Sequence, residues 1–369
     1  MTRRVTGKVV TPTGVVRQGC VEIADGRITA VAEYPSVRDG HWIVPGFVDM
    51  HTHGGGGHTF TTGDPESARQ AAEFHLGHGT TTLLASLVSS PFALMRDATA
   101  AFRPLVESGV LAGIHFEGPY LSADRCGAQN PEFLRDPSVE ELTELIEAGA
   151  GAVRMVTVAP ERAGATEAIE LLVANGVVAA IGHTDATWAQ TRAAVAAGAS
   201  VGTHLFNGMR PLHHREPGPV VALLEAPSVV CELVADGVHL HDGMLGFAAS
   251  VAGPERAALI TDAMAAAGMP DGDYELGGQA VTVADGVARL SRGGAIAGST
   301  LTMDAALRHA VGAGVALPDA VRMAATTPAR ALGLGDRVGA LRAGLRADLV
   351  VLDDDLNVVR VMRAGDWVE

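Results

Sequence analysis

The chain has few cysteines and almost no lysine. Three cysteines occur in 369 residues, Cys20, Cys126 and Cys231, and no two of them have CxxC spacing. The opening MTRRVTGKVV is not followed by the apolar stretch of a signal peptide. We therefore expect no disulfide framework and predict a reduced, cytoplasmic setting. Because Lys8 is the only lysine, a Schiff-base lysine, a P-loop lysine and a carbamylated lysine bridging two metals are all disfavoured, unless Lys8 itself served.

Long apolar runs and basic segments are also missing. No stretch of about 18 apolar residues could span a bilayer, so we expect no membrane partner. The formal net charge is -15 and no basic run occurs, which disfavours a nucleic-acid partner. Apolar residues make up 47% of the chain and charged residues 19%, enough for a large core. This composition favours an enzyme that acts on a small molecule.

Both ends of the chain have the pattern of a small β-sheet. Short β-type runs separated by glycine turns fill the first 45 residues, and two more follow residue 348. Neither end is long enough to form a core easily by itself. We therefore expect residues 1–45 and 335–369 to form one small β-sandwich domain, with residues 46–334 inserted between them.

Residues 46–334 alternate short apolar runs with amphipathic helical windows, the pattern of βα units in a parallel sheet. The pattern predicts an α/β fold, a (β/α)8 TIM barrel. A turn-rich stretch near 274–292 interrupts it, and we expect a β-hairpin excursion there, before a helix that begins near Thr302. The eight runs are 47–51, 82–88, 111–117, 153–158, 177–183, 201–205, 229–235 and 258–262.

Side chains with metal-ligand chemistry occur where five of these runs end. Residues two apart on a strand point the same way, so His51 and His53 can share one metal. An isolated HxH in a glycine-rich loop would more often be a pair of exposed histidines. Barrel active sites, however, assemble from the carboxyl ends of several strands, and we expect six side chains to converge there. They are His51, His53, Glu117, His183, His204 and Asp262.

This set predicts a metal-dependent site with one or two divalent ions. Two metals need a bridging anion, and without a barrel lysine the candidate is Glu117. We expect His183 and His204 to bind one metal, and His51 and His53 the other. Asp262, also a candidate ligand, would carry a proton as catalytic base and acid, although capping the next segment is an alternative role. The ligand types suit Zn²⁺, with Fe²⁺, Co²⁺ and Mn²⁺ as alternatives.

Five sequence segments together indicate a family. They read PGFVDMHTHG at 45–54, HFEGPY at 115–120, GHT at 182–184, THLFNGM at 203–209 and LITDA at 259–263. The HxH motif and GLRADL at 344–349 mark only a superfamily, whereas HFEGPY, and HLFNGM followed by REPG at 215–218, are more specific. From about residue 40 to 349 the chain resembles the N-acetylglucosamine-6-phosphate deacetylases of the amidohydrolase superfamily.

The resemblance implies hydrolysis of N-acetyl-D-glucosamine 6-phosphate to D-glucosamine 6-phosphate and acetate, a step of amino-sugar catabolism and cell-wall recycling. A metal would polarise the acetyl carbonyl and activate water, while Asp262 passes a proton to the departing amine. Asn207, Gly208, Arg215 and His239 match positions that contact the sugar phosphate in the family. Alternatively, Arg215 forms a surface ion pair with Glu216, and His239 is a loop histidine with its own partner.

The family also implies an oligomer and leaves the metal count open. Its members are usually dimers in which a neighbouring chain helps to close the phosphate end of the site, so we expect a homodimer. Some members bind a single metal, and for a single ion we expect the Glu117, His183 and His204 site rather than the His51 and His53 site.

Position 129 departs from the family pattern. Gln129 stands where the family has a substrate-contacting histidine, and glutamine can neither become cationic nor transfer a proton. We expect Gln129 to bind substrate and turnover to suffer, unless Cys126 or His115 compensates. Two other functions stay open: another amidohydrolase, such as a deacetylase of N-acetylgalactosamine 6-phosphate or of an unphosphorylated amide, and a non-catalytic barrel scaffold. The presence of all six candidate ligands disfavours the scaffold.

Overall fold

The computed structural model describes residues 2–36 and 40–368, and its centre is a parallel barrel. Eight strands pair in the order β14-β13-β12-β11-β10-β9-β8-β5. The first and last strands of this order, β14 and β5, come together just after their carboxyl ends. There Asp262 N donates to His51 O (2.9 Å), and His53 N donates to Ala263 O (2.7 Å). Each strand overlaps one of the eight predicted runs, so the predicted barrel is confirmed. The strands are β5 (Phe47–Asp49), β8 (Thr80–Leu87), β9 (Gly113–Glu117), β10 (Val153–Val158), β11 (Val178–Ile181), β12 (Val201–Gly202), β13 (Val230–Val234) and β14 (Ala257–Ile260).

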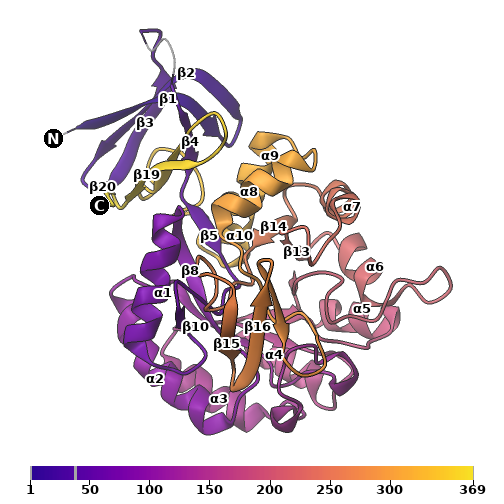
Figure 1. Cartoon of the computed structure of the whole chain (residues 1–369). Coiled ribbons are helices and arrows are strands. Elements are labelled where there is room, and N and C mark those ends of the chain that lie inside the picture. The colour runs from indigo at the N-terminus through magenta and orange to yellow at the C-terminus, as the bar shows by residue number, and fades with distance from the viewer. Residues whose placement is uncertain (1, 37–39, 369) are drawn as a thin grey trace.

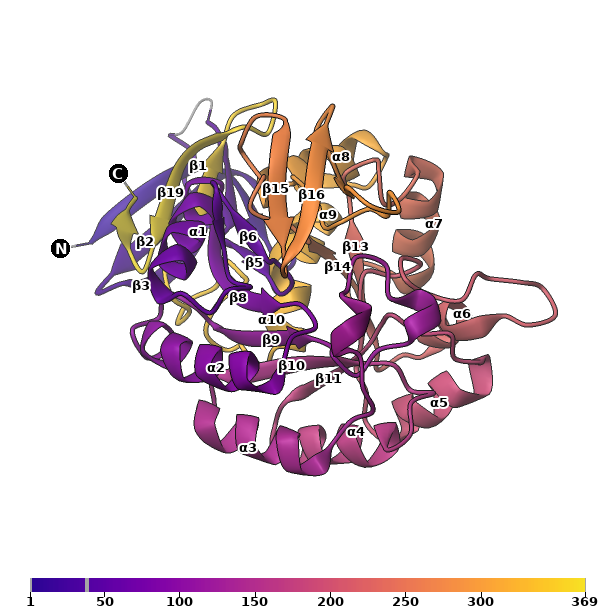
Figure 2. The same ribbon diagram turned by 60° about the horizontal axis from the view of Figure 1, so that its bottom comes forward.

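Helices cover the outside of the barrel, and Figure 2 shows α2 to α5 outside the strands β8 to β11. In α2, the buried Met95, Ala98, Phe102 and Leu105 recur at helical spacing and face the core. Every residue of β8 is buried, as expected for a parallel strand covered on both faces. The helices are α1 (Pro65–Gly77), α2 (Phe92–Glu107), α3 (Val139–Gly149), α4 (Ala165–Ala174), α5 (Trp188–Ala196), α6 (Gly218–Glu225), α7 (Asp242–Ala252), α8 (Met303–Gly312), α9 (Leu317–Val321) and α10 (Thr327–Ala331).

Shorter elements complete the chain between the barrel strands and helices. A two-stranded sheet of β6 (Gly54–Gly55) and β7 (His58–Thr59) follows β5. Two 3₁₀ turns, Ala123–Arg125 and Pro131–Phe133, follow β9, and a π-helical turn, Arg322–Thr326, joins α9 to α10. Within the described ranges, no helix is both long enough and apolar enough to cross a membrane.

The two ends of the chain meet in one seven-stranded sheet beside the barrel, near both termini (Figure 1). Successive residues of its strands face opposite sides of the sheet. Val9, Ile43 and Leu349 belong to a separate core of the terminal sheet, whereas the residue after each of them packs into the barrel core. The expected sandwich is therefore one continuous sheet. The domain limits at residues 45 and 335 stay a prediction, which the positions of these strands support. The order is β20 (Asp366–Trp367), β19 (Val358–Arg363), β18 (Leu349–Leu352), β4 (Trp42–Pro45), β1 (Arg3–Thr11), β2 (Gly14–Ala24) and β3 (Arg27–Glu33).

A three-stranded antiparallel sheet separates β14 from α8 and lies in front of the barrel in Figure 1. It comprises β15 (Gly272–Leu276), β16 (Gln279–Ala284) and β17 (Val287–Leu290). The sheet lies where the excursion near 274–292 was predicted, and it has one strand more than a hairpin. Val281 and Val283 of β16 are buried in a cluster with Val88 and Met264. Apolar packing therefore holds this sheet against the turns that follow β8 and β14.

Candidate metal centre and substrate pocket

The ends of barrel strands, and the turns just after them, position all six predicted ligands. The backbone φ angles of His183, His204 and Asp262 are 44°, 26° and 50°. Residues with a Cβ rarely adopt this left-handed region, so the turns after β11, β12 and β14 hold strained backbone. That backbone turns the three side chains back over the barrel mouth. All six predicted ligands are buried: His51, His53, Glu117, His183, His204 and Asp262.

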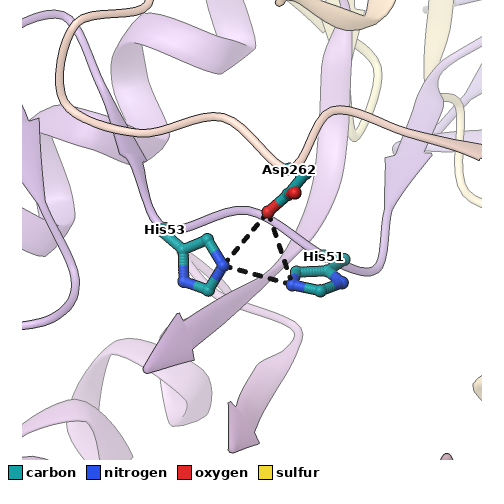
Figure 3. Close-up of side chains that lie close together, drawn as sticks. All are labelled: His51, His53 and Asp262. Carbon is teal, nitrogen blue, oxygen red and sulfur yellow. Dashed lines mark hydrogen bonds and ion pairs between the residues drawn. The ribbon is translucent and has the colours of Figure 1, made fainter. Parts of the chain in front are cut away.

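The first group of ligand atoms comes from the two ends of the barrel sheet, β5 and β14. Figure 3 shows His51, His53 and Asp262 converging. The Nε2 atoms of the two histidines lie 3.2 Å apart. Asp262 Oδ1 lies 3.2 Å from His53 Nε2 and 3.6 Å from His51 Nε2. The three side chains can therefore ligate one ion.

The second group lies beside the first and shares a carboxylate with it. Glu117 Oε1 is 2.9 Å from His183 Nε2 and 2.8 Å from His204 Nε2, and these two nitrogens are 3.1 Å apart. The other oxygen, Oε2, lies 3.3 Å from His53 Nε2. Glu117 therefore has one oxygen against each group, the position that a bridging ligand needs.

The histidine tautomers fit a metal ion. His53 Nδ1 lies 3.1 Å from Ser86 O, and His183 Nδ1 lies 2.8 Å from Arg125 O. Because a carbonyl oxygen only accepts, each Nδ1 must carry a proton, so each ring faces the shared centre with Nε2, which can bind a metal once it is unprotonated. This is the usual arrangement of metal-ligating histidine.

Glu232 is a site residue that the sequence analysis missed. It lies in the middle of β13 and is fully buried. Its Oε2 accepts hydrogen bonds from His51 Nδ1 and from His204 N, each at 3.0 Å. One carboxylate therefore orients ligands of both groups. The available signal was a single acid inside the apolar run 229–235.

Opposite charges shift the pKa values in this centre. Burial alone would raise the pKa of Glu117, but the neighbouring histidines, His51 foremost, hold it well below its usual range. The pKa of Asp262 is likewise lowered, chiefly by its hydrogen bond with His53, against the effect of burial. Burial would lower the pKa of His53, but Asp262 and Glu117 raise it to about 9. A metal that binds here must displace protons, so its affinity depends on pH.

A cavity of about 190 Å³ opens beside the two groups. Four of the five predicted substrate residues line it: Gln129, Asn207, Gly208 and His239. His239 also has a partner, since its Nδ1 lies 2.7 Å from Asp236 Oδ2, while its Nε2 lies 3.8 Å from Asp262 Oδ2. Leu276, Ile296 and Gly298 close another side of the cavity.

Arg215 lies elsewhere. It is exposed on the loop before α6, which Figure 2 shows extending away from the barrel, and its Nη1 lies 2.8 Å from His214 Nε2. It does not belong to the described lining of the cavity. Among the described contacts its partner is His214, so the surface ion pair with Glu216 is not formed.

Gln129 is buried and held at both ends of its amide. Its Nε2 donates to Glu117 Oε2 (2.6 Å), and its Oε1 accepts from Ser89 N (2.7 Å). The nearby His115 has both ring nitrogens engaged, by Ser86 Oγ at 2.9 Å and Thr157 Oγ1 at 2.8 Å. Both ring nitrogens of His115 are therefore used in hydrogen bonds, so His115 is not positioned to replace the histidine that the family has at position 129.

Comparisons with known proteins agree with this geometry. Residues 42–368 match the model of the Amidohydrolase family. An N-acetylgalactosamine-6-phosphate deacetylase of Escherichia coli O157:H7 is 38% identical over 366 residues, 97% of each chain. An N-acetylglucosamine-6-phosphate deacetylase of Lysinibacillus sphaericus is 35% identical over 369 residues, 97% of this chain and 95% of the relative.

Solved structures resemble the chain over its whole length. A mutant N-acetyl-D-glucosamine-6-phosphate deacetylase from Mycobacterium smegmatis, in complex with N-acetyl-D-glucosamine-6-phosphate, has a TM-score of 0.96 at 48% identity and covers 99% of both chains. The family match and the two ligand groups support a divalent metal. On this evidence the chain belongs to the amidohydrolase family.

Proposed function

We propose that the chain hydrolyses N-acetyl-D-glucosamine 6-phosphate to D-glucosamine 6-phosphate and acetate. The observation that carries this proposal is the cavity in which both ligand groups open beside Asn207, Gly208 and His239. A relative that is 48% identical has been solved with this sugar phosphate bound. In the reaction, the oxygen of water bonds to the acetyl carbon, the C–N bond breaks and the nitrogen gains a proton.

The ligand groups would hold one or two divalent ions. Glu117, His183 and His204 form one site, and His51, His53 and Asp262 form the other, with Glu117 between them. The mixture of imidazole and carboxylate suits Zn²⁺, with Fe²⁺, Co²⁺ and Mn²⁺ as alternatives. A bound ion supplies polarisation of the acetyl carbonyl and a more acidic water.

Asp262 is the proton carrier in this proposal. Its neighbours keep it ionised, because they hold its pKa low, so it can accept a proton from the attacking water. It can then return that proton to the departing amine. Its Oδ2 is the oxygen nearer to His239, at 3.8 Å from Nε2. His239, Asn207 and Gly208 would orient the sugar phosphate, and Gln129 would fix the Glu117 carboxylate through its hydrogen bond to Oε2.

Acetate release, measured together with metal content on the same sample, tests this function. We expect release from N-acetyl-D-glucosamine 6-phosphate in proportion to bound metal and much slower release from the unphosphorylated sugar. Metal-loaded protein that releases no acetate from the phosphorylated sugar would contradict the proposal.

A second candidate substrate is N-acetyl-D-galactosamine 6-phosphate. The chain is 38% identical to a deacetylase of that sugar, but it is 48% identical to the Mycobacterium smegmatis deacetylase solved with N-acetyl-D-glucosamine-6-phosphate, so the galactosamine sugar ranks second. The two epimers differ only at the sugar 4-hydroxyl, so comparing kcat/KM for both on one metal-loaded sample separates them. A higher kcat/KM for the galactosamine sugar would make that sugar the preferred substrate, with the same deacetylation chemistry.

We also propose a homodimer, supported by an apolar face on α7. Met244, Phe247 and Val251 recur at helical spacing and are 38%, 45% and 46% exposed. Leu212, on the loop that carries Arg215, is 48% exposed. A second copy that covers this face would explain both the apolar side chains and an arginine that lies outside its own cavity. The cytoplasmic setting stays a prediction.

Sedimentation of the metal-loaded protein tests the dimer. Phe247→Glu should convert a dimer to monomers, and Arg215→Ala should raise KM for the phosphorylated sugar while leaving the oligomer intact. A wild-type chain that sediments as a monomer at micromolar concentration would overturn the dimer without affecting the proposed chemistry.

A further inference from the structure

A second cavity, of about 100 Å³, lies at the opposite end of the barrel from the metal centre. Thr81 and Thr82 are the second and third residues of β8, Ala112 directly precedes β9, and Arg154 is the second residue of β10. The cavity therefore lies at the amino ends of three neighbouring strands. Its remaining walls come from the C-terminal end of α2 and the turn after it, the segment after α10, and the terminal sheet, including Gly109 and Arg363.

Four arginines from separate segments line this cavity: Arg154, Arg337, Arg346 and Arg363. Two are held in place by neutral or acidic partners. Arg346 Nε donates to Asp348 Oδ2 (2.6 Å) and its Nη2 donates to Thr82 Oγ1 (2.9 Å). Arg363 donates to the carbonyl of Gly109. The cavity wall is therefore fixed rather than a set of freely moving side chains.

The other two arginines lack partners among the described residues. Arg154 Nε is shielded from solvent and makes no hydrogen bond there. No side-chain hydrogen bond or ion pair is formed by Arg337 within the described ranges, and its side chain is exposed at the cavity rim. A buried guanidinium nitrogen without an acceptor is costly. Arg154 therefore calls for an acceptor that the surrounding protein does not provide.

Charge around the cavity is unbalanced. None of the described lining residues is acidic, and Asp348 behind Arg346 is the one carboxylate paired with the four arginines. Burial, and the charge of Arg346, lower the pKa of the Arg363 guanidinium. In a chain with a net charge of -15, such a concentration of positive charge is local. An anion in the cavity would relieve this repulsion and accept from Arg154.

We infer that this cavity binds a phosphate group, either free phosphate or the phosphate of a small phosphomonoester. Arginine presents planar N–H pairs that match phosphate oxygens, and four such groups favour a dianion over chloride. A volume of about 100 Å³ exceeds the share of about 30 Å³ that one water takes. The site is separate from the sugar-phosphate contacts of the proposed function, so it stands or falls independently of them.

Hydrogen exchange of the metal-loaded protein, titrated with inorganic phosphate at constant ionic strength in chloride, tests this site. We expect protection in segments 80–83, 109–113 and 334–346, followed separately from segments 127–129 and 207–208 of the substrate cavity. A parallel titration with glucose 6-phosphate distinguishes the two sources of the phosphate group. Protection by phosphate alone assigns free phosphate, whereas equal protection by both assigns a phosphomonoester site.

Variants decide whether the arginines cause the protection. Arg154→Gln and Arg337→Gln should each weaken the phosphate dependence of segment 334–346 about tenfold, because each removes a charged hydrogen-bond donor. Arg337 is exposed and unbonded, so its variant should fold. Arg342→Gln, an exposed arginine of the same segment outside the cavity, is the matched control. Unchanged titrations in both variants, or wild-type protection confined to the substrate cavity, would overturn the site.

Discussion

The two ends of the barrel strands carry opposite chemistry. At the carboxyl ends, imidazole and carboxylate atoms lie within 4.8 Å of one another in each ligand group, and three of the six side chains stand on turns with strained backbone. At the amino ends, arginines gather around a cavity, and Arg154 keeps ordinary strand backbone. Strand pairing fixes the backbone at both ends, but the turns after the strands are free to adopt unusual φ angles. The metal centre lies at the carboxyl ends, the usual place of a barrel active site, and the arginine cavity lies at the other ends.

The largest expected effect is at the carboxyl end. Glu117→Ala should remove bound metal and abolish acetate release, because Glu117 contacts histidines of both ligand groups. Metal analysis and the acetate assay on the same preparation measure this. Full metal content in the variant would show that the carboxylate is not a ligand.

Asp262→Asn should keep the sugar phosphate bound but lower kcat by about 10²-fold or more, because the amide cannot carry the proton. Steady-state kinetics on metal-matched samples provide the measurement. Turnover close to that of the wild type would remove Asp262 from the proposed chemistry.

At the other end of the strands, Asp348→Asn should affect stability instead. The Asp348 carboxylate accepts from Arg346 Nε and from Ala364 N (2.8 Å), and it is almost fully buried. We expect the free energy of unfolding to fall by about 1.5–3 kcal/mol, the usual value of a hydrogen bond to a charged group. Denaturant titration measures this loss. A change in kcat without a loss of stability would contradict the assignment of chemistry to the carboxyl ends and stability to the amino ends.

Glu232→Gln should weaken metal binding by about 10- to 100-fold, the usual effect of losing a partner that orients a ligand. The variant keeps the volume of the side chain but removes the charge that holds His51 Nδ1. Competition with a chelator measures the affinity. An unchanged affinity would mean that the strand backbone alone positions His51 and His204.

The smallest expected effect is an increase in turnover. Gln129→His should raise kcat for N-acetyl-D-glucosamine 6-phosphate about tenfold at near-neutral pH, because a cationic donor strengthens as charge develops on the substrate. Metal content and stability should stay unchanged. The amide now bonds both Glu117 and Ser89, so an unchanged or lower kcat would show that the present contacts have replaced the family role.

The sequence by itself determined the barrel and the ligand set. Apolar runs of strand length, separated by amphipathic windows, indicate strands and helices directly, because side-chain periodicity depends only on residues close together in the sequence. The HxH spacing and the position of Glu117 at the end of a run are local in the same way. Once the barrel was predicted, convergence of the six ligands followed from its geometry.

Only the tertiary structure decided the contacts between distant segments. The bonds of Glu232 to His51 and His204, the distance of Arg215 from its own cavity, and the single continuous terminal sheet all depend on how separate elements pack. The same holds for four arginines that meet from positions 154 to 363. Periodicity shows which face a residue occupies, but the partner on that face comes from elsewhere in the chain, and three-dimensional packing alone selects it.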